Sequence, residues 1–269
     1  MSTRAVLRIG VTPCPNDTFV VGGLATGLLA LPDAEVTLVL QDIEALNEAA
    51  LARAYDVVKV SCALYGELAP HYALLDVGAA IAEDYGPLIL SREPMTREDL
   101  AHARVAAPGA HTTGAALAKL YAPAAGLRHV RYDEIVPGLR RGDFDAGVVI
   151  HESRLTFRGM GLHRLVDLGH WWRATTGLPV ALGCYLIRRE LHAAHARPLE
   201  ALLRRSMALA AAGDAGVHAY IRCHAQEMGD QVLADYIALY VNARTRHLGP
   251  KGRAAILELG ARLRAGVPA

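Results

Sequence analysis

Short runs of β-branched and other apolar residues alternate, over the first two thirds of the chain, with longer segments rich in Ala and Leu. The short runs predict buried strands, and the longer segments predict helices. Strands that alternate with helices are typical of βαβ units, so the pattern predicts an α/β fold with mostly parallel or mixed sheets. The expected strands span residues 5–11, 35–40, 56–61, 87–91, 104–108, 145–150 and 180–187.

The last third of the chain follows a different pattern. From Glu190 onward the apolar positions keep helical spacing almost throughout. Interruptions at residues 213–214, 229–230 and 248–250, each containing a glycine, indicate turns between successive helices. We therefore expect this third to be helical.

Two turn-rich junctions, at residues 91–95 and 175–179, bracket a central segment with strands and helices of its own. They fit crossovers between two lobes. On this interpretation residues 1–91 plus 180–269 form lobe I, and residues 92–179 form lobe II. A chain that crosses twice can build a hinged, two-lobed protein, and small ligands tend to bind in the cleft between such lobes.

Composition narrows the class of partner. A chain of 269 residues with 52% hydrophobic content can bury a sizeable core. The formal net charge of +1, without a block of Lys or Arg, argues against nucleic acid and favours a small molecule. The four cysteines lack the spacing of a zinc site or a disulfide framework. Because no segment matches a signal peptide or a membrane span, we expect a cytoplasmic protein without membrane insertion, its oligomeric state left open.

Candidate chemistry gathers where strands end, because ligands of open α/β sheets bind beyond the carboxyl ends of strands, near helix N-termini. The first such place is TPCPNDTF, directly after strand 5–11. Its two prolines stiffen a turn, and Asn16 or Asp17 fits the cap of a helix that begins near Thr18. A rigid capped turn and a direct substrate contact are equally good interpretations.

The second place is Lys59-Val60-Ser61, at the end of strand 56–61 and before an expected helix in CALYGELAPHY. Ser61 is predicted to cap that helix or to offer its hydroxyl to an anionic group. Lys59 stands between apolar neighbours, as an edge residue or as a buried, paired charge. The sequence leaves both alternatives open.

The third place follows strand 104–108, where PGAHTTG opens the helix AALAKLYAP. Thr112 and Thr113 stand at the N-terminus of that helix, and two hydroxyls with nearby amides suit a carboxylate. A plain threonine cap is the favoured interpretation for one such site alone. Two cap-like sites, one in each lobe, favour a shared ligand more than either site does alone.

His151 follows the expected strand 145–150. An imidazole titrates near neutral pH, which a general base requires. Most of the 12 histidines lie in helical or loop contexts typical of a solvated surface, so the strand-end position singles out His151 as the candidate base. Neighbours that fit either a role in the site or an ordinary structural role are Glu152, Arg154, Trp171 and Trp172.

A family resemblance rests on PCPNDTF, KVS, GAHTTGAAL and DAGVVIHESRLTF, with VDLGHWW, GLPVALG and YVN further along. These stretches keep their order over essentially the whole chain. On them the chain resembles the 1,4-dihydroxy-6-naphthoate synthase family, enzymes of the futalosine route to menaquinone. The resemblance implies a type II periplasmic-binding-protein-like fold and a catalyst with no metal or organic cofactor.

The resemblance also implies an activity. Members of the family convert cyclic dehypoxanthinylfutalosine, a small carboxylated substrate, to 1,4-dihydroxy-6-naphthoate and release dihydroxyacetone. By the same resemblance His151 is the proton acceptor, and the substrate-binding residues are Lys59, Val60, Ser61, Thr112 and Thr113. Two alternatives stay open: chorismate dehydratase of the same pathway, against which PCPNDTF and IHE argue, and a non-catalytic solute-binding protein, against which the missing signal peptide argues.

Overall fold

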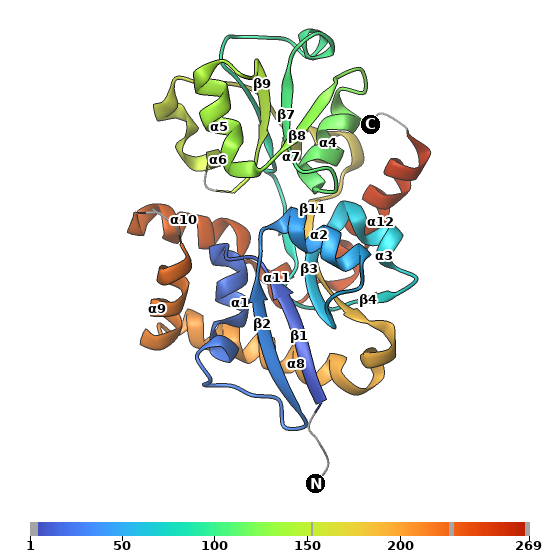
Figure 1. The fold of residues 1–269 in the computed structure, drawn as a ribbon, viewed down its shortest axis with the longest axis vertical. Coiled ribbons are helices and arrows are strands. Elements are labelled where there is room, and N and C mark those ends of the chain that lie inside the picture. Colours follow the sequence, from blue (N-terminus) through green and yellow to red (C-terminus); the bar gives the residue numbers. More distant parts are fainter. Residues whose placement is uncertain (1–4, 152, 226–228, 267–269) are drawn as a thin grey trace. The chain divides into compact units, whose positions relative to one another are not determined.

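The computed structural model describes residues 5–151, 153–225 and 229–266 (Figure 1). The chain divides into two compact units, each treated separately below. Unit 1 comprises Met1–Ser61, Tyr65–Ile81 and Gly183–Pro250, and unit 2 comprises Cys62–Leu64, Ala82–Leu182 and Lys251–Ala269. The lobes expected from the sequence differ from these units in four stretches, because residues 62–64, 82–91, 180–182 and 251–269 all belong to unit 2.

The first sheet is mixed. Its strands are β1 (Ala5–Val11), β2 (Ala34–Leu40), β3 (Val57–Ser61), β4 (Tyr72–Leu74), β5 (Ala80–Ala82) and β11 (Val180–Arg188). β2 and β3 lie on either side of β1 and run parallel to it. β11 runs antiparallel to β3, and β4 runs antiparallel to β11.

The helices of unit 1 are α1 (Pro15–Ala25), α2 (Ile43–Leu51), α3 (Tyr65–Leu68), α8 (Arg189–Ala211), α9 (Ala215–His224), α10 (Asp230–Tyr240) and α11 (Ala243–Arg246). α1 is almost wholly buried, including its polar residues Asn16, Asp17 and Thr18, so it presents no polar face to solvent. It packs against α8, α9 and α10, which lie beside it in Figure 1. Gly23 lies against α8, and its amide donates to the Ser206 hydroxyl at 2.8 Å.

Unit 2 holds a second mixed sheet. Its strands are β6 (Leu88–Ser91), β7 (Val105–Pro108), β8 (Leu127–Val130), β9 (Ala146–Val149) and β10 (His163–Asp167), in the order β10-β6-β9-β7-β8. β7 runs parallel to both β8 and β9, and β6 runs antiparallel to β9. The helices are α4 (Thr113–Tyr121), α5 (Tyr132–Arg141), α6 (Ser153–Thr156), α7 (Leu168–Thr176) and most of α12 (Gly249–Ala265).

Every strand expected from the sequence is present, with bounds that differ by at most one residue at either end, and the last third is helical as predicted. The pattern missed β4, β5, β8 and β10. β8 and β10 are the outermost strands of their sheet and carry charged and polar residues, which suit edge strands but hide the apolar signal. β4 and β5 are three residues long, too short to show a period.

One predicted helix is wrong. The segment CALYGELAPHY forms a 3₁₀ turn (Cys62–Leu64) and the four-residue α3, and then enters β4. Pro70 disfavours helical backbone at the residue before it. Tyr72 is fully buried instead, and its hydroxyl donates to the carbonyl oxygen of Tyr55 at 2.9 Å. A tertiary contact therefore decides this segment.

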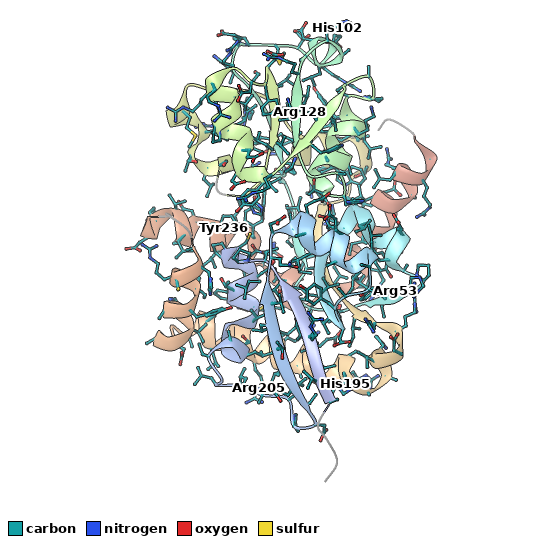
Figure 2. All side chains as sticks on the ribbon, in the orientation of Figure 1. Arg53, His102, Arg128, His195, Arg205 and Tyr236 are labelled. Atoms are coloured by element: carbon teal, nitrogen blue, oxygen red, sulfur yellow. The ribbon has the colours of Figure 1, made fainter. Side chains whose placement is uncertain are left out.

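Charged side chains face solvent on both units. Arg53 and Arg205 are exposed on unit 1, and His102 and Arg128 are exposed on unit 2 (Figure 2). His102 illustrates the solvated role expected for most histidines of this chain.

Gly169 marks a tight contact at the start of α7. The Asp167 carboxylate caps this helix by accepting from the amides of Gly169 and His170. A Cβ atom at Gly169 would overlap the backbone carbonyl group of Tyr85, which cannot rotate away. We expect Gly169→Ala to lower the free energy of unfolding of unit 2 by about 1–3 kcal/mol. Urea unfolding followed by tryptophan fluorescence measures this, because both tryptophans belong to unit 2.

The matched control is Gly126→Ala, where an added Cβ meets nothing within 4 Å. Its effect should stay within about 0.5 kcal/mol. Equal effects of the two substitutions would contradict the proposed overlap.

Candidate active site

Lys59 forms a buried ion pair in unit 1. Its Nζ lies 2.8 Å from Asp17 Oδ1 and donates to the carbonyl oxygen of Gly78 at 2.9 Å. Lys59 is 3% exposed and Asp17 1%. The ammonium also lies 4.8 Å from the centre of the Tyr185 ring. Of the two alternatives left by the sequence, Lys59 is therefore the buried, paired charge.

Asp17 is the centre of a small polar cluster. The Thr12 hydroxyl donates to its Oδ2 at 2.6 Å, and Asn16 Nδ2 donates to its Oδ1 at 3.2 Å. The predicted cap by Asn16 or Asp17 is wrong, because α1 begins at Pro15 after Cys14 and has no side-chain cap. Proline is favoured at the first helical position, which starts the helix three residues earlier than expected.

Tyr185 is a further buried neighbour of this cluster. Burial raises the pKa of its phenol well above the ordinary value, and the nearby Asp17 carboxylate adds to the effect. The phenol therefore stays neutral and presents its ring to the Lys59 ammonium. A neutral aromatic face is a favourable neighbour for a cation.

Ser61 is oriented by Asn47, a residue that the sequence interpretation missed. The Ser61 amide donates to Asn47 Oδ1 at 2.9 Å, and Asn47 Nδ2 donates to the Ser61 hydroxyl at 3.1 Å. Asn47 is fully buried on α2, so a polar residue among the apolar positions of that helix was the available signal. Ser61 is the last residue of β3 and directly precedes the 3₁₀ turn Cys62–Leu64. Its hydroxyl accepts from Asn47, which leaves its own proton for another acceptor.

Val60 lies between these two residues in β3. Its side chain is fully buried, and it pairs with Cys184 of β11. Its side chain therefore belongs to the packing of unit 1.

Thr112 and Thr113 begin α4 in unit 2, as predicted, but their hydroxyls do different things. Thr112 is the N-cap and accepts from the Ala115 amide at 3.2 Å. The Thr113 hydroxyl donates to the carbonyl oxygen of Leu182 at 2.8 Å and accepts from the Ala63 amide at 3.2 Å. Thr113 thus ties the start of the helix to two other segments of unit 2.

His151 follows β9 and Ile150, at the carboxyl end of the strand. Its backbone is left-handed, with φ 61°, a conformation that costs a non-glycine residue roughly 1–3 kcal/mol. Its imidazole meets the Tyr132 ring nearly edge to face, with ring centres 4.6 Å apart. The side chain is half-buried. Strain of this kind persists only where surrounding structure enforces it.

α4 packs directly on the strand that leads to His151. A Cβ atom at Gly114 would lie 3.2 Å from Ile150 Cγ2 and 3.4 Å from Val148 Cγ1. The first turn of α4 therefore rests against the residue that precedes His151. Thr112, Thr113 and His151 all belong to unit 2, and the contact between Gly114 and Ile150 links the start of α4 to the strand end.

Arg154 stabilises the segment after His151. Its guanidinium forms an ion pair with Asp167 at 2.7 Å and donates to the carbonyl oxygen of Gly86. Its amide donates to the carbonyl oxygen of His151 at 3.4 Å. Arg154 therefore joins α6 to the start of α7. Glu152, another neighbour of His151 named in the sequence analysis, lies outside the described residues.

The start of β9 is held by an ion pair between Arg104 and Asp145. The Arg104 guanidinium donates to both Asp145 oxygens and lowers the pKa of that carboxyl to about 2. The Arg104 amide donates to the same carboxylate, so the pair aligns β7 with β9.

The two tryptophans serve packing in different degrees. Trp172 is fully buried, its Nε1 donates to the carbonyl oxygen of Pro179 at 3.2 Å, and Arg262 covers its ring. Trp171 is half-buried and meets the edge of Tyr121. Of the two roles that the sequence left open, Trp172 therefore has the ordinary structural one.

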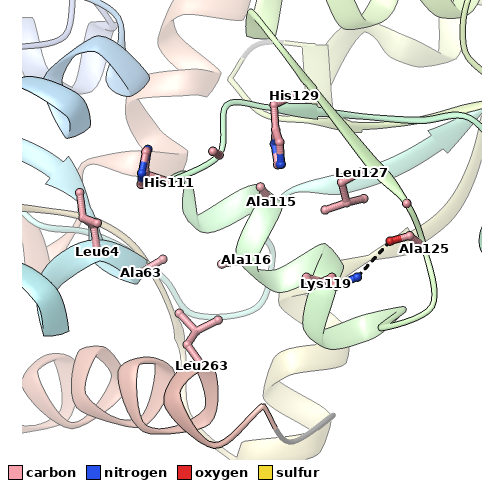
Figure 3. A pocket seen from close by; sticks show the side chains of 12 residues that line it. Ala63, Leu64, His111, Ala115, Ala116, Lys119, Ala125, Leu127, His129 and Leu263 are labelled. Atoms are coloured by element: carbon pink, nitrogen blue, oxygen red, sulfur yellow. Dashed lines mark hydrogen bonds between the residues drawn. The ribbon is translucent and has the colours of Figure 1, made fainter.

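A pocket of about 490 Å³ lies beside α4 (Figure 3). Its wall is mostly alanine and leucine, with His111, Lys119 and His129 as its basic residues. Lys119 Nζ donates to the carbonyl oxygens of Pro123 and Ala125. The predicted site residues do not line this pocket. In the described part of the chain, no group of three or more His, Cys, Asp or Glu side chains is placed to hold a metal ion.

Comparison with known proteins assigns the family. A family model described as Menaquinone biosynthesis matches residues 7–265. The chain belongs to the menaquinone biosynthesis family. A 1,4-dihydroxy-6-naphthoate synthase of Thermus thermophilus is 41% identical over 253 residues, which cover 94% of this chain and 92% of that protein. A Streptomyces coelicolor protein of the same name is 40% identical over 257 residues, which cover 93% and 90%. The predicted family and enzyme class, a lyase, are thereby confirmed.

Solved structures confirm the predicted fold class for this menaquinone biosynthesis family member. Protein AF1704 of Archaeoglobus fulgidus matches with a TM-score of 0.91 and 28% identity over 97% of both chains. The periplasmic aliphatic sulphonate binding protein SsuA of Escherichia coli matches with a TM-score of 0.68 and 16% identity, over 99% of this chain and 90% of that one. The fold is that of periplasmic binding proteins. Among the described helices, none is both long and apolar enough to cross a membrane.

The Lys59–Asp17 pair predicts a large loss of stability when one partner is removed. In Asp17→Asn the Lys59 ammonium keeps its carbonyl acceptor but loses its counter-charge, and we expect about 3–5 kcal/mol of destabilisation. Thermal and urea unfolding followed by circular dichroism measure it. As a control, Arg141→Met removes the Arg141–Asp143 pair, whose side chains are 62% and 49% exposed, and should cost less than about 1 kcal/mol. Equal losses of stability in the two variants would show that the buried pair contributes no more than the exposed one.

Proposed function

We propose that this enzyme converts cyclic dehypoxanthinylfutalosine to 1,4-dihydroxy-6-naphthoate with release of dihydroxyacetone. The observation that carries the proposal is the likeness, over more than nine tenths of the chain, to two proteins named 1,4-dihydroxy-6-naphthoate synthase. The geometry of unit 2 supports it, because a histidine at a strand end stands next to a helix N-terminus. That arrangement offers a base and an anion site for a small carboxylated substrate.

The N-terminus of α4 is the proposed carboxylate site. First-turn amides have no acceptor inside their own helix, and the helix dipole favours an anion there. Thr112 takes the amide of Ala115 and keeps a hydroxyl proton that can be donated to a carboxylate oxygen. Thr113, whose proton is already donated to Leu182, holds the helix start in place and contributes its backbone amide.

His151 is the proposed proton acceptor. It removes a proton from a substrate hydroxyl or an adjacent carbon, and a retro-aldol-type cleavage then breaks the carbon–carbon bond to the three-carbon fragment. The fragment leaves as dihydroxyacetone while the ring becomes aromatic, and aromatisation drives the reaction. The enzyme positions the substrate and accepts one proton, an acid–base contribution of roughly 10²–10⁴-fold.

The residues proposed from unit 1 have unequal parts. Ser61 keeps a hydroxyl proton to donate, so it is the proposed polar contact with substrate. The Lys59 ammonium is occupied by Asp17 and Gly78, so its proposed part is to hold the end of β3. Any contact by Val60 uses its backbone, because its side chain is buried. The cytoplasmic location stays a prediction from the sequence.

The role of His151 is tested with His151→Asn. Asn tolerates a left-handed backbone, so the substitution removes the base without adding strain. We expect kcat to fall by at least about 10²-fold and substrate affinity to stay within about tenfold, because a base acts mainly in the transition state. Product formation by chromatography and calorimetric binding measure the two quantities.

Parallel assays with chorismate test the competing assignment. Turnover of chorismate alone by the wild-type protein would replace the proposed activity by that of a dehydratase. A near-normal kcat in His151→Asn would instead keep the reaction and remove His151 from it.

The carboxylate site is tested by a pair of variants at Thr112. Both Asp and Asn are good helix caps, so Thr112→Asp and Thr112→Asn preserve α4. Only the aspartate brings a negative charge toward the substrate carboxylate, and we expect it to raise KM at least about tenfold above that of the Asn variant. Steady-state kinetics with matched melting temperatures make the comparison. Equal KM values would leave Thr112 as a cap only.

A further inference from the structure

We infer that Tyr132 is a positioning residue for His151, with its ring setting the orientation in which the imidazole accepts a proton. The inference rests on the proposed role of His151. It starts from the ring contact already described, with centres 4.6 Å apart and planes inclined at 66°. Such edge-to-face pairs are favoured over other arrangements of two aromatic rings.

The backbone alone leaves the imidazole undetermined. The left-handed φ of 61° at His151 sets the direction of the Cα–Cβ bond, but two side-chain torsions remain. The Tyr132 ring restricts them, because an aromatic contact of this kind favours one orientation by about two- to tenfold. A strained backbone and a neighbouring ring therefore act together on one side chain.

Tyr132 is itself held in place by tight packing of α5 on β9. It is the first residue of α5, and Ile135 and Leu139 one and two turns further on are fully buried. A Cβ atom at Gly147 of β9 would lie 2.5 Å from Ile135 Cγ2, so glycine there lets the helix approach the strand closely. The helix thus carries Tyr132 at a fixed position relative to the end of β9.

The two faces of β9 are covered by different helices. Side chains of a strand point alternately to its two faces. Val148 and Ile150 face Gly114 of α4, whereas Gly147 faces α5. His151 lies beyond the strand in a left-handed turn, and its contact with the Tyr132 ring places it on the side of α5. The proton acceptor and the proposed carboxylate site thus approach the strand end from opposite faces.

This arrangement predicts a specific kinetic effect. Base catalysis depends on geometry, and a displacement of about 1 Å can cost as much as 10²-fold in rate. Loss of the Tyr132 ring should therefore reduce kcat and leave KM nearly unchanged. The substitution should leave α5 in place, because the buried apolar residues of the helix anchor it.

The experiment compares Tyr132→Leu with Tyr132→Phe. We expect Leu to lower kcat about tenfold with KM within about twofold, and Phe to keep both, since it retains the ring. In histidine-labelled protein, the His151 imidazole resonance, assigned by its loss in His151→Asn, should move in Tyr132→Leu and stay in Tyr132→Phe. Tyr121→Leu is the matched control. It removes another edge-to-face pair of unit 2, that with Trp171, and should leave kcat unchanged.

The outcomes separate the inference from the proposed function. An unmoved His151 resonance in Tyr132→Leu overturns the inference, and so does a moved resonance with normal kcat. A kcat loss that Tyr121→Leu reproduces also overturns it, because it would then reflect general loosening of unit 2. Failure of the wild-type protein to turn over the substrate overturns the proposed function, while the resonance comparison still decides whether Tyr132 orients the imidazole.

Discussion

Close packing of helices against strand β9 governs the geometry of unit 2. Gly147 admits Ile135 of α5 on one face, and Gly114 of α4 meets Val148 and Ile150 on the other. Because protein interiors are packed as densely as organic crystals, contacts of this kind leave little freedom in the distance between either helix and the strand. The two helix N-termini and the left-handed residue at the strand end are consequently held in one arrangement.

Unit 1 depends on a different kind of constraint. A buried ion pair gains little stability over apolar residues of the same volume, because desolvation offsets most of the attraction. The pair instead restricts movement, because neither Lys59 nor Asp17 can move away without leaving the charge of the other buried and unpaired. The pair ties the first turn of α1 to the end of β3, and Asn47 fixes Ser61 at the same strand end. Both polar contacts thus act on the segment expected to meet substrate.

The fold is shared with binding proteins that transport small ligands, and fold alone does not assign chemistry. The chemistry has to be argued from the groups placed on that fold. A histidine in a strained backbone next to an aromatic ring suits proton transfer, and a capped helix N-terminus suits a carboxylate. The lyase class comes from the similar proteins named 1,4-dihydroxy-6-naphthoate synthase, and these groups are the proposed physical basis of that class within unit 2.

The sequence by itself determined the features that arise from local rules. Apolar runs located the central strands, helical spacing located the C-terminal helices, and cap chemistry placed Thr112 at a helix start. Only the tertiary structure decided the partners. Lys59 pairs with Asp17, which is 42 residues away in the sequence, and Ser61 is bonded to Asn47 of α2. Tyr132 of α5 contacts His151. Such pairings depend on how elements pack, which no local pattern of residues encodes. The buried charge, the edge strands and the orienting ring were for that reason visible only in three dimensions.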